Sequence, residues 1–224
     1  MAFIQQVSAT GTSPQTLNLT GVTAGSTIVV FLWDGATSAP ATRTVSDGTS
    51  YTAGATASDA VNNVWLGIFT LQNAGSGTHA IVGTTVGTDV TFMMAVELSA
   101  PSSGAVLDTN AVFQNAPGAG ADALTTGALT IGSSCTLVGM ASDTSNVAAV
   151  DEPTVGTGFA SQAANFNSVM GSWRLETGPF SSNHAATFGA PASASRFIAG
   201  GAAIQEASAG SPPVNLMGRQ VYAL

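Results

Sequence analysis

Apolar and polar residues alternate with a period of two along much of this 224-residue chain, and helical periodicity is nearly absent. The clearest alternation runs from Asp89 to Ser99. One face carries Val90, Phe92, Met94, Val96 and Leu98, and the other carries Thr91, Met93, Ala95, Glu97 and Ser99. Because successive side chains of a strand point to opposite faces, this pattern predicts a half-buried β-strand.

The segment Ser26–Trp33 is a continuous run of β-branched, aliphatic and aromatic residues that ends at the turn dipeptide Asp34-Gly35. Such a run predicts a central strand buried on both faces. Shorter runs predict further strands at 15–20, 64–71, 79–86, 135–141, 169–176, 185–188 and 197–204. Ser58–Asn63 and Ala160–Asn165 are too short and too polar for stable helices, and we interpret both as loops or single turns.

Short strands separated by glycine-rich turns, without a regular alternation of strands and helices, indicate an all-β fold. The connections are then hairpins and longer crossings between sheets. We therefore expect a two-sheet antiparallel β-sandwich of the jelly-roll or Greek-key type, with a short C-terminal extension.

Two stretches of the chain are similar in their order of features. Val22–Thr27 leads into the strand that ends at Asp34, and Leu129–Ser134 leads into the strand that starts at Cys135 and is followed by Asp143. A long loop rich in Ala, Gly, Ser and Thr follows each strand. Two interpretations stay open: a pseudo-symmetry between two parts of one domain, or the common use of Gly-Ser before a strand.

The chain divides into a predicted sandwich domain, residues 1–206, and a C-terminal segment, residues 207–224. Ala207–Pro213 is a flexible and then stiff linker, and the residues after it are too apolar for an ordinary frayed terminus. They form either a last edge strand of their own domain or an arm that docks on a neighbouring subunit. The candidate contact residues of the arm are Leu216, Met217, Arg219, Val221, Tyr222 and Leu224.

Charge is scarce in this sequence. Only 7% of the residues are charged, Lys is absent, the four cations are Arg43, Arg174, Arg196 and Arg219, and the formal net charge is −8. Neutralising phosphate groups requires clustered Lys or Arg, so nucleic acids and anionic membrane surfaces are excluded as partners. No apolar stretch approaches the roughly 20 residues needed to span a bilayer, which favours a soluble protein.

The amino-terminal segment Met1–Ser8 lacks the positive and apolar regions of a signal peptide. We therefore expect synthesis in the cytoplasm. A Lys-free surface rich in Ser, Thr, Asn and Gly is nevertheless typical of proteins that work outside cells. A virion protein, made in the host cytoplasm and released by lysis, reconciles the two features. A secreted protein without its leader would have the same composition.

Residues capable of catalysis or metal binding do not form a known motif. His79 and His184 both lie at predicted turns, and the adjacent Asp151 and Glu152 would point to opposite faces of an extended chain. Asp47–Ser50 and Asp143–Asn146 offer oxygen ligands for Ca²⁺, but such turns usually bond their own backbone. We expect no enzymatic activity, no metal and no cofactor, and a buried Cys135.

Exposed aromatic side chains could still bind a sugar by stacking on its apolar face. Trp65 and Trp173 lie within predicted strands and are expected in the core. Trp33, at a strand end beside Asp34, and Tyr51, in a loop, are the candidate glycan contacts.

The order of several segments resembles that of β-sandwich virion proteins of tailed bacteriophages. The acidic turn and aromatic of Val45–Thr52 stand between strands like 26–33 and 64–69. Val96-Glu97-Leu98-Ser99-Ala100, Thr136-Leu137-Val138 and Phe197–Ile204 follow in matching places, so that the likeness covers residues 15–206. Ser50 stands where Asn is more usual. The resemblance implies a jelly-roll-like sandwich on a capsid or tail, often oligomeric and sometimes glycan-binding.

These features lead to one expected function and one alternative. The first is a non-enzymatic virion structural protein, a capsid decoration, head-fibre or tail component that contacts other virion proteins and forms a homo-oligomer. Burial in such an assembly would explain the missing Lys, since covered edge strands need no protecting charge. The alternative is a carbohydrate-binding module that adsorbs to a glycan of the host surface.

Overall fold

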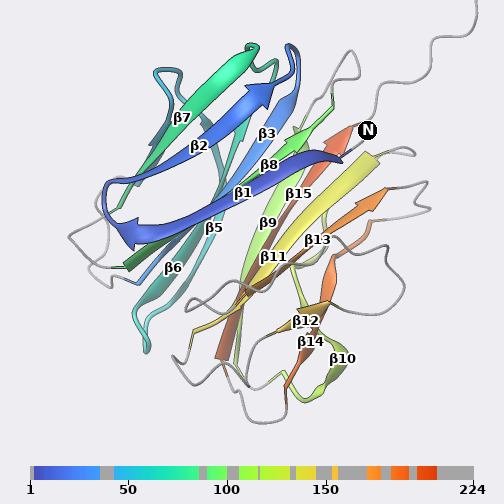
Figure 1. Ribbon diagram of the computed structural model, residues 1–224. Helices are drawn as coiled ribbons and strands as arrows, with labels where there is room; N and C mark the ends of the chain where they lie inside the picture. The colour runs from blue at the N-terminus through green and yellow to red at the C-terminus, as the bar shows by residue number, and fades with distance from the viewer. Residues whose placement is uncertain are drawn as a thin grey trace, which may run out of the picture.

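The computed structural model describes residues 3–35, 43–85, 90–99, 106–115, 117–131, 135–144, 153–155, 171–177, 183–191 and 196–205. Within these ranges the chain forms fifteen β-strands and no helix (Figure 1). The predicted all-β fold is thereby confirmed. No helix in the described ranges is long and apolar enough to cross a membrane.

The first half of the chain, residues 3–98, forms two antiparallel sheets. Sheet A has the order β1-β8-β3-β6-β5 and sheet B the order β2-β7-β4. The strands of sheet A are β1 (Phe3–Thr12), β8 (Val90–Leu98), β3 (Thr27–Asp34), β6 (Val64–Leu71) and β5 (Thr52–Asp59). Those of sheet B are β2 (Gln15–Val22), β7 (Gly77–Thr84) and β4 (Thr44–Ser46).

The second half, residues 106–205, also forms two antiparallel sheets. Sheet C has the order β13-β11-β15-β9 and sheet D the order β10-β14-β12. The strands of sheet C are β13 (Gly171–Thr177), β11 (Cys135–Asp143), β15 (Arg196–Gln205) and β9 (Val106–Asn115). Those of sheet D are β10 (Gly120–Thr125), β14 (Thr187–Ala190) and β12 (Thr154–Val155).

The two halves share one topology. Without β5, the first half has seven strands, which correspond in chain order to the seven strands β9 through β15 of the second half. Under this correspondence, sheet A has the same strand order as sheet C, and sheet B the same order as sheet D. In each half the first strand pairs with the last, as in a jelly roll. The pseudo-symmetry interpretation is therefore confirmed, and Asp34 and Asp143 end the equivalent strands β3 and β11.

The four sheets stack in the order B, A, C, D, which places sheets B and D at opposite ends of the molecule (Figure 1). Sheets A and C pack face to face through Phe31, Leu66 and Met94 of sheet A and Met140 and Ile198 of sheet C. Sheet B covers the other face of sheet A, and sheet D the other face of sheet C. The expected sandwich is thus present twice, with four sheets where two were expected.

Stacking in four layers explains why small residues are so frequent in the central strands. Sheets A and C are covered on both faces, so both side-chain rows must fit between neighbouring layers. A Cβ added at Gly200 of β15 would lie 3.1 Å from atoms of Ile68 and Leu66 in sheet A. Larger side chains at such positions would force the sheets apart.

Most predicted strands are confirmed, and β6 matches its predicted range in full. The strand at 26–33 is buried on both faces, as expected. The expectation that residues 89–99 form a half-buried strand is wrong: Met94 and Val96 face sheet C, while Met93 and Ala95 face sheet B. The polar residues Thr91 and Glu97 are buried as well.

Six strands were not predicted, namely β1, β4, β5, β9, β10 and β12. The segment Ser58–Asn63, interpreted as a loop or turn, contains the end of β5 and the turn that joins it to β6. The segment Ala160–Asn165 and the predicted arm, residues 207–224, lie outside the described residues.

Candidate functional site

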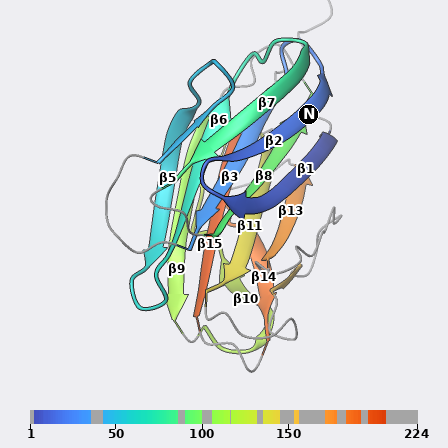
Figure 2. The ribbon, with the colours of Figure 1, turned by 60° about the vertical axis from the view of Figure 1, so that its left-hand side comes forward.

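The strands β5 and β9 lie side by side where the two halves of the chain meet (Figure 2). Each is the last strand of its sheet, and the two are not paired in a common ladder. The backbone N–H of Ala55 donates to the side-chain Oγ1 of Thr109, with the two atoms 2.8 Å apart. We call this contact between β5 and β9 the seam.

Both strands carry a β-bulge at the same end of the seam. In β5, Gly54 and Ala55 together stand opposite one residue of β6, because the register shifts between Ala53 and Thr56. In β9, Leu107 is the extra residue, because the register with β15 shifts between Ala203 and Ile204. Bulges bend a strand and re-aim its side chains, and they are frequent next to binding sites.

Glycine is required at the bulge of β5. A Cβ added at Gly54 would lie 2.5 Å from Oγ1 of Thr109, closer than any non-bonded carbon and oxygen can approach. The absence of a side chain lets β5 approach β9 closely here.

A groove opens beside the two bulges and encloses about 300 Å³. Its polar lining consists of Thr52, Thr70, Gln72, Asp108 and Thr109. Its remaining lining consists of Ala53, Gly54, Val106 and Leu107. The groove therefore combines hydroxyl, amide and carboxylate groups with small and branched apolar surfaces.

The protein itself uses only part of the hydrogen-bonding capacity of this lining. Thr109 accepts the N–H of Ala55, which leaves its hydroxyl hydrogen to donate. One oxygen of Asp108, Oδ2, accepts the backbone N–H of Thr130 at 2.7 Å, while Oδ1 remains as a second acceptor. A ligand in the groove would meet both donors and acceptors.

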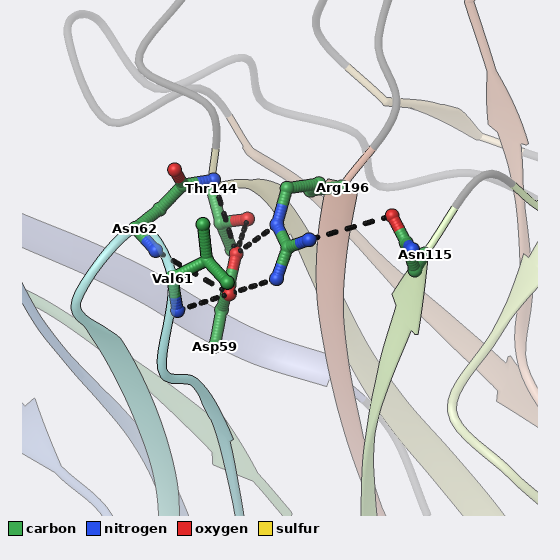
Figure 3. Close-up of polar contacts among 6 residues, drawn as sticks. All are labelled: Asp59, Val61, Asn62, Asn115, Thr144 and Arg196. Carbon is green, nitrogen blue, oxygen red and sulfur yellow. Dashed lines mark hydrogen bonds and ion pairs between the residues drawn. The ribbon is translucent and has the colours of Figure 1, made fainter.

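The opposite end of the seam is closed by a polar cluster around Asp59, the last residue of β5 (Figure 3). The buried carboxylate of Asp59 accepts hydrogen bonds from Arg196 and from the Thr144 hydroxyl, with the latter at 2.7 Å. It also accepts the backbone N–H of Val61 at 3.0 Å and thereby caps the turn after β5. Arg196 reaches on to Oδ1 of Asn115, the last residue of β9.

The surroundings of Asp59 favour its charged form. Burial by itself would raise the pKa of this carboxyl, but the hydrogen bonds from Arg196, Thr144 and the backbone outweigh it and hold the pKa well below the ordinary value of 3.8. The guanidinium of Arg196 also lies over the ring of Phe113 in β9, 4.7 Å from the ring centre. The cluster is therefore a charged clamp between the two halves.

A second cluster holds the turn between β4 and β5. Oδ2 of Asp47 contacts Nδ1 of His79 in β7 and accepts the Tyr51 hydroxyl at 3.3 Å. Nε2 of His79 lies 2.9 Å from the carbonyl oxygen of Gly75. Both ring nitrogens thus face acceptors, an arrangement that only the doubly protonated imidazolium satisfies in full.

The same contacts bear on the predicted Ca²⁺ ligands at Asp47–Ser50. Oδ1 of Asp47 accepts the backbone N–H of Thr49 at 3.0 Å, so both of its oxygens already serve donors of the protein. Among the described residues, no three His, Cys, Asp or Glu side chains gather where they could hold a metal ion. Part of the second predicted turn, Asp143–Asn146, lies outside those residues.

A third buried carboxylate, Glu97 of β8, joins β1, β2 and β3 near their ends. It accepts the side-chain amide of Gln5 at 2.6 Å, the backbone N–H of Thr23 at 2.9 Å and the Ser26 hydroxyl at 2.8 Å. The sequence analysis placed Glu97 on the exposed face of a half-buried strand and missed this role. A buried polar residue within an apolar strand was the available signal.

The two candidate glycan contacts are not exposed. Trp33 is 8% exposed and packs between sheets A and C, and Tyr51 is 6% exposed and packs between sheets A and B. The prediction that their rings are open to stacking is therefore wrong, because sheet C covers Trp33 at the end of β3 and side chains of sheets A and B surround Tyr51. Trp65, expected in the core, is partly buried under the guanidinium of Arg43.

Of the other candidate residues, some lie within the described part of the chain and some lie outside it. Cys135 is buried, as predicted. His184 bridges to Leu129 through backbone hydrogen bonds in both directions. The side chain of Trp173 is outside the described set, as are Asp151, Glu152 and all six candidate residues of the arm, Leu216, Met217, Arg219, Val221, Tyr222 and Leu224.

The residues of the seam were not singled out from the sequence. β5 reads Thr-Ala-Gly-Ala-Thr-Ala-Ser-Asp, which lacks the large apolar residues that make an alternation visible. No protein family model, no curated protein and no solved structure matches this chain. The resemblance to phage virion sandwiches stays a prediction that rests on the order of the predicted segments.

Proposed function

We propose that this protein is a non-enzymatic structural component of a bacteriophage virion, a capsid decoration, head-fibre or tail protein that docks on the particle. The observation that carries the proposal is a pair of neighbouring, uncharged edge strands, β1 and β2. β1 is the last strand of sheet A and β2 the last strand of sheet B, and the two lie against each other.

These two strands lack the usual protection of a sheet edge. Neither contains Asp, Glu, Lys or Arg along its ten or eight residues. No described strand pairs with the outer edge of either one. Soluble proteins normally guard such edges with charge, because unpaired N–H and C=O groups invite another strand. An edge that is covered in an assembly needs no such guard.

The buried carboxylates support a structural role in a different way. Asp59 links the end of β5 to the start of β15, Glu97 links β8 to the beginning of the chain, and Asp47 links the turn after β4 to β7. Each of them accepts several hydrogen bonds that hold distant segments together. The partners we propose are other virion proteins and further copies of this chain.

The test compares incorporation of edge variants into particles. Ser8→Lys and Thr10→Lys place a charge at exposed positions of β1. Ala80→Lys is the matched control, because Ala80 is exposed on β7, the middle strand of sheet B. Mass spectrometry of purified particles should find the control at the wild-type level and the edge variants depleted. Normal incorporation of both edge variants would overturn the docking role of β1.

The predicted C-terminal arm has its own test. Truncation after Ala209 should abolish incorporation and leave the folded domain intact, as judged by its circular dichroism and melting temperature. Normal incorporation of the truncated protein would remove the arm from the proposal without affecting the edge strands. Carbohydrate adsorption, the alternative function, loses Trp33 and Tyr51 as its contacts because both are buried.

A further inference from the structure

We infer that the groove between β5 and β9 binds a single neutral sugar unit, such as one residue of a surface glycan. The inference does not depend on the virion role, and it uses none of the residues proposed for docking. It starts from the position of the groove, beside two bulged edge strands that belong to different halves of the chain.

The size of the groove suits one sugar ring. Small-molecule sites enclose roughly 300–1,000 Å³, and this groove, at about 300 Å³, lies at the lower end of that range. An oligosaccharide would therefore place one residue in the groove and extend its other residues into solvent.

The lining matches the surface of a sugar. A pyranose offers hydroxyl groups that both donate and accept, together with apolar C–H groups. The hydroxyl of Thr52 can serve in either sense and that of Thr109 can donate, the amide of Gln72 has both kinds of group, and Oδ1 of Asp108 can accept. Ala53, Val106 and Leu107 supply apolar contact.

Charge selects against other ligands. Among the described residues, the lining of the groove contains one carboxylate and no cation, and the chain carries a formal net charge of −8. An anionic sugar or a phosphate would be repelled. A metal ion would need several converging oxygens in place of one carboxylate that already accepts the N–H of Thr130.

The groove is held in shape before any ligand binds. Thr109 is fixed by the N–H of Ala55, and the two strands are clamped at the far end of the seam by Asp59 and Arg196. A site whose groups are already in place loses little conformational entropy on binding. The small entropic cost favours the binding of a ligand as small as a single sugar.

The test uses saturation-transfer difference NMR on the full chain with a panel of single sugars. Glucose, galactose, mannose, rhamnose and N-acetylglucosamine are the neutral probes, and glucuronic acid and sialic acid are the anionic ones. We expect at least one neutral sugar to give transfer signals and the anionic sugars to give none. Absence of signal for every neutral sugar, or a stronger signal for an anionic one, would overturn the inference.

Variants then locate the site. Ala53→Leu fills the groove from an exposed position of β5, and should abolish the signal. Gln72→Ala removes the exposed amide and should weaken binding about tenfold, the effect of losing one good hydrogen bond. The controls are Ala80→Leu, which makes the same change, and Asn18→Ala, which also removes a side-chain amide; both lie at exposed positions of sheet B. Binding that survives Ala53→Leu, or that falls equally in the controls, would place the sugar elsewhere and refute this site.

Discussion

Asp59 at the end of β5 and Arg196 at the start of β15 form an ion pair across 137 positions of the chain (Figure 3). One partner belongs to each jelly-roll half. The carboxylate is fully buried, and the guanidinium is held between it and Asn115. The pair thus fixes how the two halves stack, together with the apolar core between sheets A and C.

Replacing the carboxylate of this pair should destabilise the whole chain. Asp59→Asn keeps the shape but leaves Arg196 without its counter-charge and places an amide NH₂ among donors. We expect the free energy of unfolding to fall by about 3 kcal/mol and the melting temperature by on the order of 10 °C. The control is Asp122→Asn, because Asp122 is exposed and accepts the Thr187 hydroxyl at 2.8 Å. Equal losses in the two variants would contradict the clamp.

Acid should release the same clamp. The pKa of Asp59 is lowered in the folded protein, so its stabilisation is fully present above the ordinary carboxyl value of 3.8 and is lost as the pH falls below that value. The difference in unfolding free energy between wild type and Asp59→Asn should therefore shrink on acidification. Urea denaturation at several pH values measures it, and a difference that is constant across the acid range would argue against a charged Asp59.

The contact between His79 and Asp47 should respond to pH in the opposite direction. Burial by itself lowers the pKa of His79, but the Gly75 carbonyl and the Asp47 carboxylate outweigh it, and Glu97 adds to them, so the pKa is raised. The stabilisation is present below the ordinary histidine pKa and is lost as the pH rises through the raised value. We expect the stability advantage of wild type over His79→Gln to decrease as the pH rises above the ordinary histidine value of 6.5. An advantage that grows over this range would show that the ring is neutral.

Glu97 should tolerate loss of its charge poorly. In Glu97→Gln one of the two acceptor oxygens becomes a donor that faces the donors of Gln5, Thr23 or Ser26. We expect the free energy of unfolding to fall by about 2 kcal/mol. Gln5→Ala is the comparison, since it removes one donor from a partly exposed position and should cost less. Chemical denaturation followed by circular dichroism separates the two, and an equally mild effect would mean that the carboxylate is not needed.

The close approach at the seam can be tested with a double-mutant cycle. Gly54→Ala places a methyl group against Thr109 and should lower the free energy of unfolding by about 1–3 kcal/mol. Adding Thr109→Ala removes the two nearest atoms that it meets, Oγ1 and Cγ2, so the double variant should be more stable than the sum of the single changes predicts. Gly75→Ala is the control, because a Cβ there meets nothing within 4 Å. Additive losses would place Gly54 out of contact with Thr109.

The local sequence pattern was sufficient to predict a strand wherever the strand consists of large apolar residues. β3 and β6 were predicted because runs of Val, Ile, Leu, Phe and Trp favour a pleated, buried segment in any surroundings. The burial of Cys135 was also predicted from the neighbouring residues, whereas the equivalence of Asp34 and Asp143 was one of two open interpretations until the strand orders established it. β5 and β9 were missed because small and polar residues form their seam, and such residues give no periodic signal.

The sequence by itself determined an all-β chain, because alternation and turn residues act through the backbone of each segment, and it left open whether the two similar stretches mark equivalent parts. Only the tertiary structure decided that the parts stack into four layers, that Trp33 and Tyr51 are covered, and that Asp59 meets Arg196. Burial and pairing of a side chain depend on segments that are distant along the chain, 137 positions in the case of Asp59 and Arg196. No local pattern specifies which of those segments will cover it.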